Sequence, residues 1–174
     1  EAVTDANKDE YVKNLIYHKL VKEIEGPINA FKEGFNLIIN PEYLEYFSVV
    51  ELDKLISGES TIDFEDFKTN TKYGGGYNAS SKQIIWFWEV VKEYDQETLT
   101  SLWFFASGLT RAVLGGFKNR ALEICKVESS EVSLPMSHTC FSRIDLPEYL
   151  TKEDLAQKLL LAISEGKEGF GFAQ

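Results

Sequence analysis

The sequence predicts an α+β fold in which the helices come first and the strands come late. Through residues 1–57 the apolar side chains recur three or four positions apart, which is the spacing of one helix face. After Gly115-Gly116 the pattern changes to alternation, with Leu122 and Ile124 on either side of Glu123, which is typical of a strand. A chain of 174 residues with 44% apolar residues can form one domain or two small lobes.

Two helices are expected at the start of the chain. The first runs from about Lys8 to Glu25, because Asn7 has an acid three residues later in the pattern of an N-terminal cap. Gly26-Pro27 is expected to interrupt it, with the proline in the first turn of a second helix. Asn40-Pro41 ends this second helix and begins another. The apolar stripe of the second helix is Ile28, Phe31, Phe35 and Ile38.

A further helical segment, after the one that begins at Asn40-Pro41, leads to a candidate linker. Ser48 and Glu51 have the spacing of a capping box, and Gly58 is the kind of residue that ends a helix. The short polar stretch that follows predicts a linker. Its residues are Gly58, Glu59, Ser60 and Thr61.

Three more helices are expected between the linker and the strands. Asp63 can cap a short helix, Ser80 or Ser81 an aromatic-rich one, and Asp95 a third. The glycines of residues 73–77 predict a loop. No strand precedes this loop and no Lys-Ser or Lys-Thr follows it, so it does not match a phosphate-binding loop.

Two strands and a helix are expected to complete the chain. The first strand covers residues 122–127, and the second runs from Thr139 to Leu146 between two Leu-Pro pairs. Thr151 and Asp154 have the spacing of a helix cap. The last helix carries the apolar residues Leu155, Leu159, Leu160 and Ile163.

Charge and hydropathy exclude several classes of partner. The chain has 18 basic and 28 acidic residues, a net charge of −10, and no block of Lys and Arg, so we expect no nucleic-acid partner. The longest apolar run, residues 84–88, is too short to cross a bilayer, and no signal peptide opens the sequence. We therefore expect no membrane association and a cytoplasmic or nuclear location.

The two cysteines, Cys125 and Cys140, are too few for a disulfide framework and lack the spacing of a zinc site. We expect no metal and no cofactor. Cys125 lies between Ile124 and Lys126 in a predicted strand, with nothing beside it that would activate a nucleophile. Core packing is the simplest interpretation of that residue.

The densest group of reactive side chains is residues 137–140, Ser-His-Thr-Cys. An exposed thiolate is a strong nucleophile and a good leaving group, so Cys140 can accept an acyl group and pass it on. Spacing alone does not make His138 its base, because residues two apart share a face only in a regular strand. From these residues alone, a buried structural thiol beside a surface histidine remains the more frequent arrangement.

Residues 134–141, Leu-Pro-Met-Ser-His-Thr-Cys-Phe, and residues 146–149, Leu-Pro-Glu-Tyr, resemble the active-site signature of HECT-type ubiquitin ligases. The same family order continues through Asn36, residues 81–89, Gly115-Gly116-Phe117 and residues 168–171. The resemblance therefore covers essentially the whole chain. It implies a helical remnant of the N-lobe over residues 1–57, a hinge over 58–61 and an α+β catalytic C-lobe over 62–174.

The resemblance also implies roles for single residues. Cys140 would carry ubiquitin as a thioester, and His138 and Thr139 would shape the pocket around it. Asp145 would help to orient or deprotonate the incoming lysine amine, and Phe170 would assist the second transfer. The implied partners are ubiquitin, a ubiquitin-conjugating enzyme and a protein substrate, with the docking site for the conjugating enzyme mostly outside this chain.

The sequence departs from the family pattern at two positions, and two other functions are alternatives to this interpretation. Phe170 is followed by one residue more than is usual, and Val113 occupies a position where proline is common. A ubiquitin-binding adaptor without catalysis is the first alternative. A cysteine hydrolase using Cys140 and His138 is the second, although such enzymes usually draw their histidine from far away in the sequence.

Overall fold

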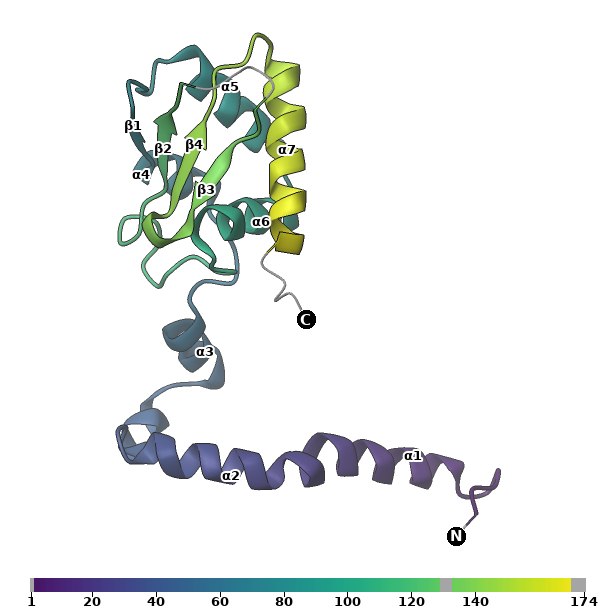
Figure 1. The fold of residues 1–174 in the computed structure, drawn as a ribbon. Helices are drawn as coiled ribbons and strands as arrows, with labels where there is room; N and C mark the ends of the chain where they lie inside the picture. The colour runs from purple at the N-terminus through teal and green to yellow at the C-terminus, as the bar shows by residue number, and fades with distance from the viewer. Residues whose placement is uncertain (1, 129–132, 170–174) are drawn as a thin grey trace. The chain divides into compact units, whose positions relative to one another are not determined.

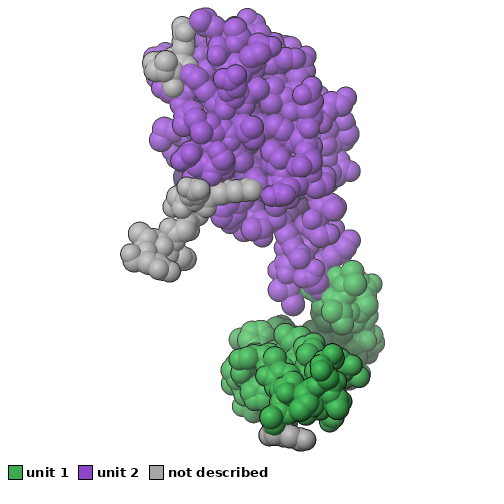
Figure 2. Space-filling model, turned by 90° about the vertical axis from the view of Figure 1, so that its right-hand side faces the viewer, with its two compact units in different colours: residues 1–52 green, residues 53–174 purple. Residues whose placement is uncertain are grey.

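The structure is a computed structural model that describes residues 2–128 and 133–169. Its contacts divide the chain into two compact units, residues 1–52 and 53–174 (Figure 2). Helices in both units and a four-stranded sheet in the second confirm the predicted α+β class. No helix in the described ranges is long and apolar enough to cross a membrane.

The first unit is dominated by a helical stretch that contradicts the predicted break at Gly26-Pro27. Helix α1 spans Lys8–Tyr17, a π-helical turn follows over His18–Lys22, and helix α2 spans Glu23–Asn36 with Pro27 inside it (Figure 1). Proline removes one backbone donor and crowds the carbonyl four residues earlier, here that of Glu23. The wider π turn ends directly before Glu23, and such turns let a helix absorb a local backbone irregularity.

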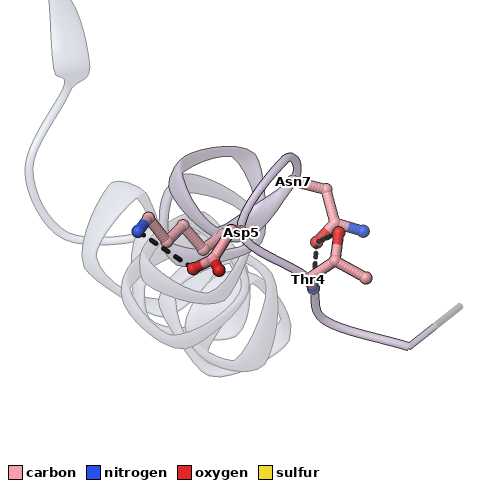
Figure 3. Close-up of polar contacts among 4 residues, drawn as sticks. Thr4, Asp5 and Asn7 are labelled. Carbon is pink, nitrogen blue, oxygen red and sulfur yellow. Dashed lines mark hydrogen bonds and ion pairs between the residues drawn. The ribbon is translucent and has the colours of Figure 1, made fainter.

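The predicted cap at Asn7 is also wrong, although the helix begins where expected. The Asn7 Oδ1 atom accepts a hydrogen bond from the Thr4 backbone N–H at 2.7 Å and lies 3.2 Å from Thr4 Oγ1 (Figure 3). Asn7 makes no side-chain cap to the helix that follows. Asp5 pairs with Lys8 at 3.2 Å. Asn7 therefore closes the turn before α1, because its side chain reaches the preceding backbone first.

The predicted helix start at Asn40-Pro41 and the predicted capping box at Ser48 are confirmed. Asn40 Oδ1 accepts from the Glu42 N–H at 3.0 Å and starts the 3-10 helix Pro41–Tyr46. Ser48 and Glu51 form the predicted capping box, with Glu51 Oε2 accepting from the Ser48 N–H at 2.8 Å, at the start of α3, Val49–Ser57. The division between the two units falls within α3.

The second unit packs its helices against a mixed sheet. Strands β1 (Lys72–Gly74), β2 (Glu123–Lys126) and β4 (Arg143–Leu146) are parallel, and β3 (Met136–His138) runs antiparallel to β4 at the edge. The order across the sheet is β1-β2-β4-β3, with the helices on one side (Figure 1). The helices are α4 (Phe64–Asn70), α5 (Lys82–Val91), α6 (Gln96–Ser107) and α7 (Lys152–Gly169).

The strands show where the sequence prediction was incomplete. Strand β1 overlaps the start of the predicted glycine loop, and only Gly75 and Gly76 after it have the positive φ angles of a turn. Ser81 occupies the N-cap position of α5, but its hydroxyl accepts from the Asn78 N–H instead of capping the helix. The predicted caps Asp63 and Asp95 are confirmed, since each carboxylate accepts from the N–H three residues later.

An aromatic cluster forms the centre of the second unit. Phe67 is fully buried and contacts the rings of Trp88, Trp103 and Phe117 at centroid distances of 5.6, 5.9 and 4.4 Å. Trp103 is buried too, and its indole N–H donates to the Arg111 carbonyl at 3.0 Å. Ring contacts from two helices and a turn therefore meet on one side chain of α4.

We expect Phe67→Ala to lower the free energy of unfolding of the second unit by about 3–5 kcal/mol, because it leaves a cavity and removes three ring contacts. Chemical denaturation followed by tryptophan fluorescence measures the change. Phe141→Ala is the matched control, since that ring is 75% exposed and its loss should change stability by less than about 0.5 kcal/mol. Equal effects of the two substitutions would show that the cluster does not govern stability.

Candidate active site

Cys140 lies in a 3-10 turn, Thr139–Phe141, that connects β3 to β4. The predicted strand from Thr139 to Leu146 is therefore wrong in its first half. The strand begins only at Arg143, because Ser142 has the left-handed backbone angles φ 50° and ψ 48° and ends the turn. This turn places Cys140 outside the ladder of the sheet, where its side chain is exposed.

His138 and Asp145 flank the turn on neighbouring antiparallel strands. His138 Nε2 lies 3.0 Å from Asp145 Oδ2, and Arg143 Nε donates to Asp145 Oδ1 at 2.6 Å. The Asp145 side chain is only 16% exposed, whereas His138 is 46% exposed. The Asp145 carboxylate also raises the pKa of the Arg143 guanidinium above its usual value by hydrogen bonding to it.

This arrangement brings together two of the predicted site residues, His138 and Asp145, through a direct contact. Among the residues that the structure describes, none forms a hydrogen bond with the Cys140 thiol, and the imidazole of His138 turns to the carboxylate. A Cys-His hydrolase would need its imidazole on the thiol. In the described structure the His138 imidazole is paired with Asp145, which is not the arrangement of a Cys-His hydrolase.

Cys125 has the opposite environment. It is 4% exposed on β2, and burial together with the nearby Glu123 carboxylate raises the pKa of its thiol. A Cβ added to Gly74 on the adjacent strand would lie 2.7 Å from the sulfur of Cys125, so only glycine leaves room for it. The expectation that Cys125 packs in the core is confirmed.

We expect iodoacetamide to alkylate Cys140 in the folded chain and to leave Cys125 unmodified. Alkylation requires an accessible thiolate, and Cys125 has neither access nor an easily lost proton. Peptide mass spectrometry after a short exposure at pH 8 measures both sites. The same exposure in denaturant provides the control, because both cysteines should then react, and equal labelling in the folded chain would contradict the assignment.

The predicted linker residues are attached to the second unit at its start. The Glu59 N–H donates to the Ala112 carbonyl at 2.9 Å, and a Cβ on Gly58 would overlap that carbonyl oxygen. Asp53 and Arg111 form an ion pair at 2.6 Å in the same region.

The residue after the linker is also anchored, because Ile62 exchanges two hydrogen bonds with the Gln96 side chain. A hinge within residues 58–61 stays a prediction, and Ser60 and Thr61 lie between these anchored positions.

Two further groups lie near Cys140, one in contact with its turn and one in contact with Asp145, and the sequence pattern did not point to them. Arg120 Nε donates to Ser142 Oγ at 2.8 Å across 22 positions of sequence, and Arg143 holds Asp145. No spacing rule connects Arg120 with the turn. The predicted Phe170 lies outside the described residues, and no group of three or more metal-binding side chains occurs in the described part of the chain.

The chain is similar to a known family over nearly its whole length. The family described as HECT-domain (ubiquitin-transferase) matches residues 1–173. The E3 ubiquitin-protein ligase UPL1 of Arabidopsis thaliana is 46% identical over 98% of this chain and 5% of its own length. The E3 ubiquitin-protein ligases ptr1 of Schizosaccharomyces pombe and TOM1 of Saccharomyces cerevisiae are 43% and 39% identical over 98% of this chain. The chain spans 5–6% of the length of these three relatives.

Proposed function

The chain belongs to the HECT-domain family of ubiquitin transferases, and from this we propose that Cys140 accepts ubiquitin as a thioester and passes it to a lysine. The observation that carries the proposal is the contrast between the two thiols. Cys140 is exposed on a turn, whereas Cys125 is buried and its pKa is raised. Thioester exchange needs an accessible thiolate, so only Cys140 suits the reaction.

The first step is a thioester exchange. The Cys140 sulfur attacks the C-terminal carbonyl carbon of ubiquitin, which arrives as a thioester of a conjugating enzyme. A new carbon–sulfur bond forms, the bond to the donor's sulfur breaks, and the proton of the Cys140 thiol passes to the departing thiolate. The two thiols are chemically alike, so the enzyme's task is to position them.

The second step transfers ubiquitin to an amine. A lysine Nζ attacks the thioester carbonyl, an amide bond forms, and Cys140 leaves as a thiolate. The lysine must first lose a proton, since its pKa is about 10.4 in water. We infer that Asp145, at the base of the turn, attracts the ammonium group and receives or relays its proton, with His138 held beside it at 3.0 Å.

The remaining roles follow from the family. Thr139 lies next to Cys140 in the turn and would, with His138, shape the pocket around the thioester. Phe170 would assist the second transfer. A hinge at residues 58–61 would let the catalytic unit face first the donor and then the acceptor. The docking surface for the conjugating enzyme would lie mostly outside this chain.

A ubiquitin thioester with a small thiol as leaving group tests the proposal without the conjugating enzyme. Incubation with the chain should give an adduct larger by one ubiquitin on a non-reducing gel, and excess dithiothreitol should remove it. Omission of the thioester group from ubiquitin is the control. Ubiquitin binding without an adduct would overturn the proposal and support an adaptor instead.

A further inference from the structure

The turn that carries Cys140 ends in a strained residue. Ser142 is the one non-glycine residue with a left-handed φ, 50°, among the residues that the structure describes. Serine pays a steric cost in this conformation, since its Cβ crowds the backbone. Ser142 is also 1% exposed, so water does not stabilise its hydroxyl. Contacts within the protein must therefore hold it in place.

Those contacts come from the turn itself, where the Ser142 N–H donates to the Thr139 carbonyl at 3.2 Å, from the Arg120 guanidinium group and from strand β2. Arg120 Nε donates to Ser142 Oγ at 2.8 Å, and Arg120 Nη2 donates to the Thr139 carbonyl at 3.4 Å. The Glu123 N–H donates to the Ser142 carbonyl at 2.9 Å. The Arg120 contacts fall on the two residues that flank the Cys140-Phe141 segment. Arg120 thus joins both ends of the turn.

The Arg120 guanidinium group donates its hydrogen bonds to this turn and forms no ion pair with a described residue. Among the described residues, no carboxylate lies within ion-pair distance of its guanidinium group, and its hydrogen bonds go to neutral oxygens of Thr139 and Ser142. Hydrogen bonds from a charged donor are stronger than those between neutral groups, and the planar fork fixes their directions. A lysine has no such fork and would not hold both oxygens in the same way.

We propose that Arg120 is a positioning residue, which with Ser142 fixes the Cys140 turn in the conformation that presents the sulfur to the incoming ubiquitin thioester. The inference rests on the proposed thioester function and adds a group that touches neither ubiquitin nor the reacting sulfur. The turn is already in its strained conformation before the ubiquitin thioester arrives. The exchange step therefore does not include the entropy loss of ordering the turn. Loss of the Arg120 guanidinium group would leave the Cys140 thiol exposed but would change its position.

The test measures the rate of adduct formation from the small-thiol ubiquitin thioester over a range of donor concentrations. Arg120→Ala and Ser142→Ala should each lower the maximal rate by about tenfold, the size expected for the loss of one charge-assisted hydrogen bond. The double variant should lose no more than Arg120→Ala alone, because Arg120→Ala already removes the contact that Ser142→Ala removes. Lys118→Ala is the matched control, as an exposed cation two positions away.

A second set of variants separates positioning from general damage to the fold. Ser142→Gly in the Arg120→Ala background should recover most of the lost rate, because glycine adopts a left-handed φ without the steric cost. The iodoacetamide reaction of Cys140 should stay within about twofold, because alkylation needs exposure rather than exact placement. If Arg120→Ala melts at a lower temperature than Lys118→Ala, Arg120→Lys replaces it with the same expected loss of rate.

Several outcomes would overturn the inference. One is an Arg120→Ala rate equal to that of Lys118→Ala, and another is a double variant whose loss is the product of the two single losses. Failure of the Ser142→Gly rescue would assign Arg120 to another role. These outcomes differ from failure of the proposed function itself, in which the unmodified chain would form no reductant-sensitive adduct.

Discussion

Cys140→Ala is expected to abolish the ubiquitin adduct, whereas Cys125→Ala should retain it with a rate within about twofold of the unmodified chain. Alanine offers no nucleophile at the exposed turn, and the buried Cys125 thiol has a raised pKa and no access for a protein donor. Non-reducing gels and intact-mass spectrometry measure the adduct. An adduct that survives Cys140→Ala and disappears with Cys125→Ala would reverse the assignment.

Cys140→Ser refines the same experiment. A hydroxyl is a much weaker nucleophile than a thiolate near neutral pH, so an adduct should form far more slowly. Any adduct would be an ester, which dithiothreitol does not cleave rapidly and alkali does. A reductant-resistant adduct on the serine variant would therefore locate the acyl group at position 140, independently of the alanine result.

Asp145→Asn is expected to slow transfer from the loaded chain to a lysine by on the order of 10²-fold at pH 7, the range of a lost general base. The first step should change little, because no amine takes part in it. A carboxylate has room for about four hydrogen bonds, so the contacts with Arg143 and His138 leave acceptor capacity for an ammonium group. Pre-loaded chain, chased with free lysine at several pH values, separates the two steps.

The pH dependence gives the sharper readout for this variant. Only about one lysine amine in 10³ is neutral near pH 7, given a pKa of about 10.4, and this fraction rises about tenfold with each pH unit. The deficit of Asp145→Asn should therefore shrink as the pH rises toward 10. Arg143→Gln is the control, since it weakens the ion pair but keeps the carboxylate. A deficit that is constant with pH, or one equally large in Arg143→Gln, would assign Asp145 a structural role only.

Local signals in the sequence were sufficient for most of the helices. Asp63, Asp95 and Ser48 with Glu51 are predicted as caps, and each accepts the expected backbone hydrogen bond. Asn40, predicted to begin a helix, also caps it. These contacts join residues two or three positions apart, so the sequence contains both partners. The motif around Cys140 could be found in the sequence for the same reason, because its residues 137–140 are consecutive.

The predictions that the structure contradicts fail for other physical reasons. Pro27 is expected to break a helix, but it lies inside α2, which begins directly after the π turn of residues 18–22, and Asn7 contacts Thr4 instead of its own helix. Strand β1 has only three residues, and its pairing with β2 joins positions about fifty residues apart, which no local pattern reveals. The strand predicted from Thr139 was interrupted because Ser142 adopts a left-handed conformation that serine seldom takes without support.

The sequence by itself determined the α+β class and the family, and it predicted Cys140 as the reactive thiol, because each depends on residue types at short, fixed spacing. Only the tertiary structure decided that Cys140 is exposed while Cys125 is buried, and that His138 contacts Asp145 rather than the thiol. It also placed Arg120 against Ser142, across 22 positions of sequence. Burial and long-range hydrogen bonds depend on how distant segments pack, and no local pattern of residues encodes them.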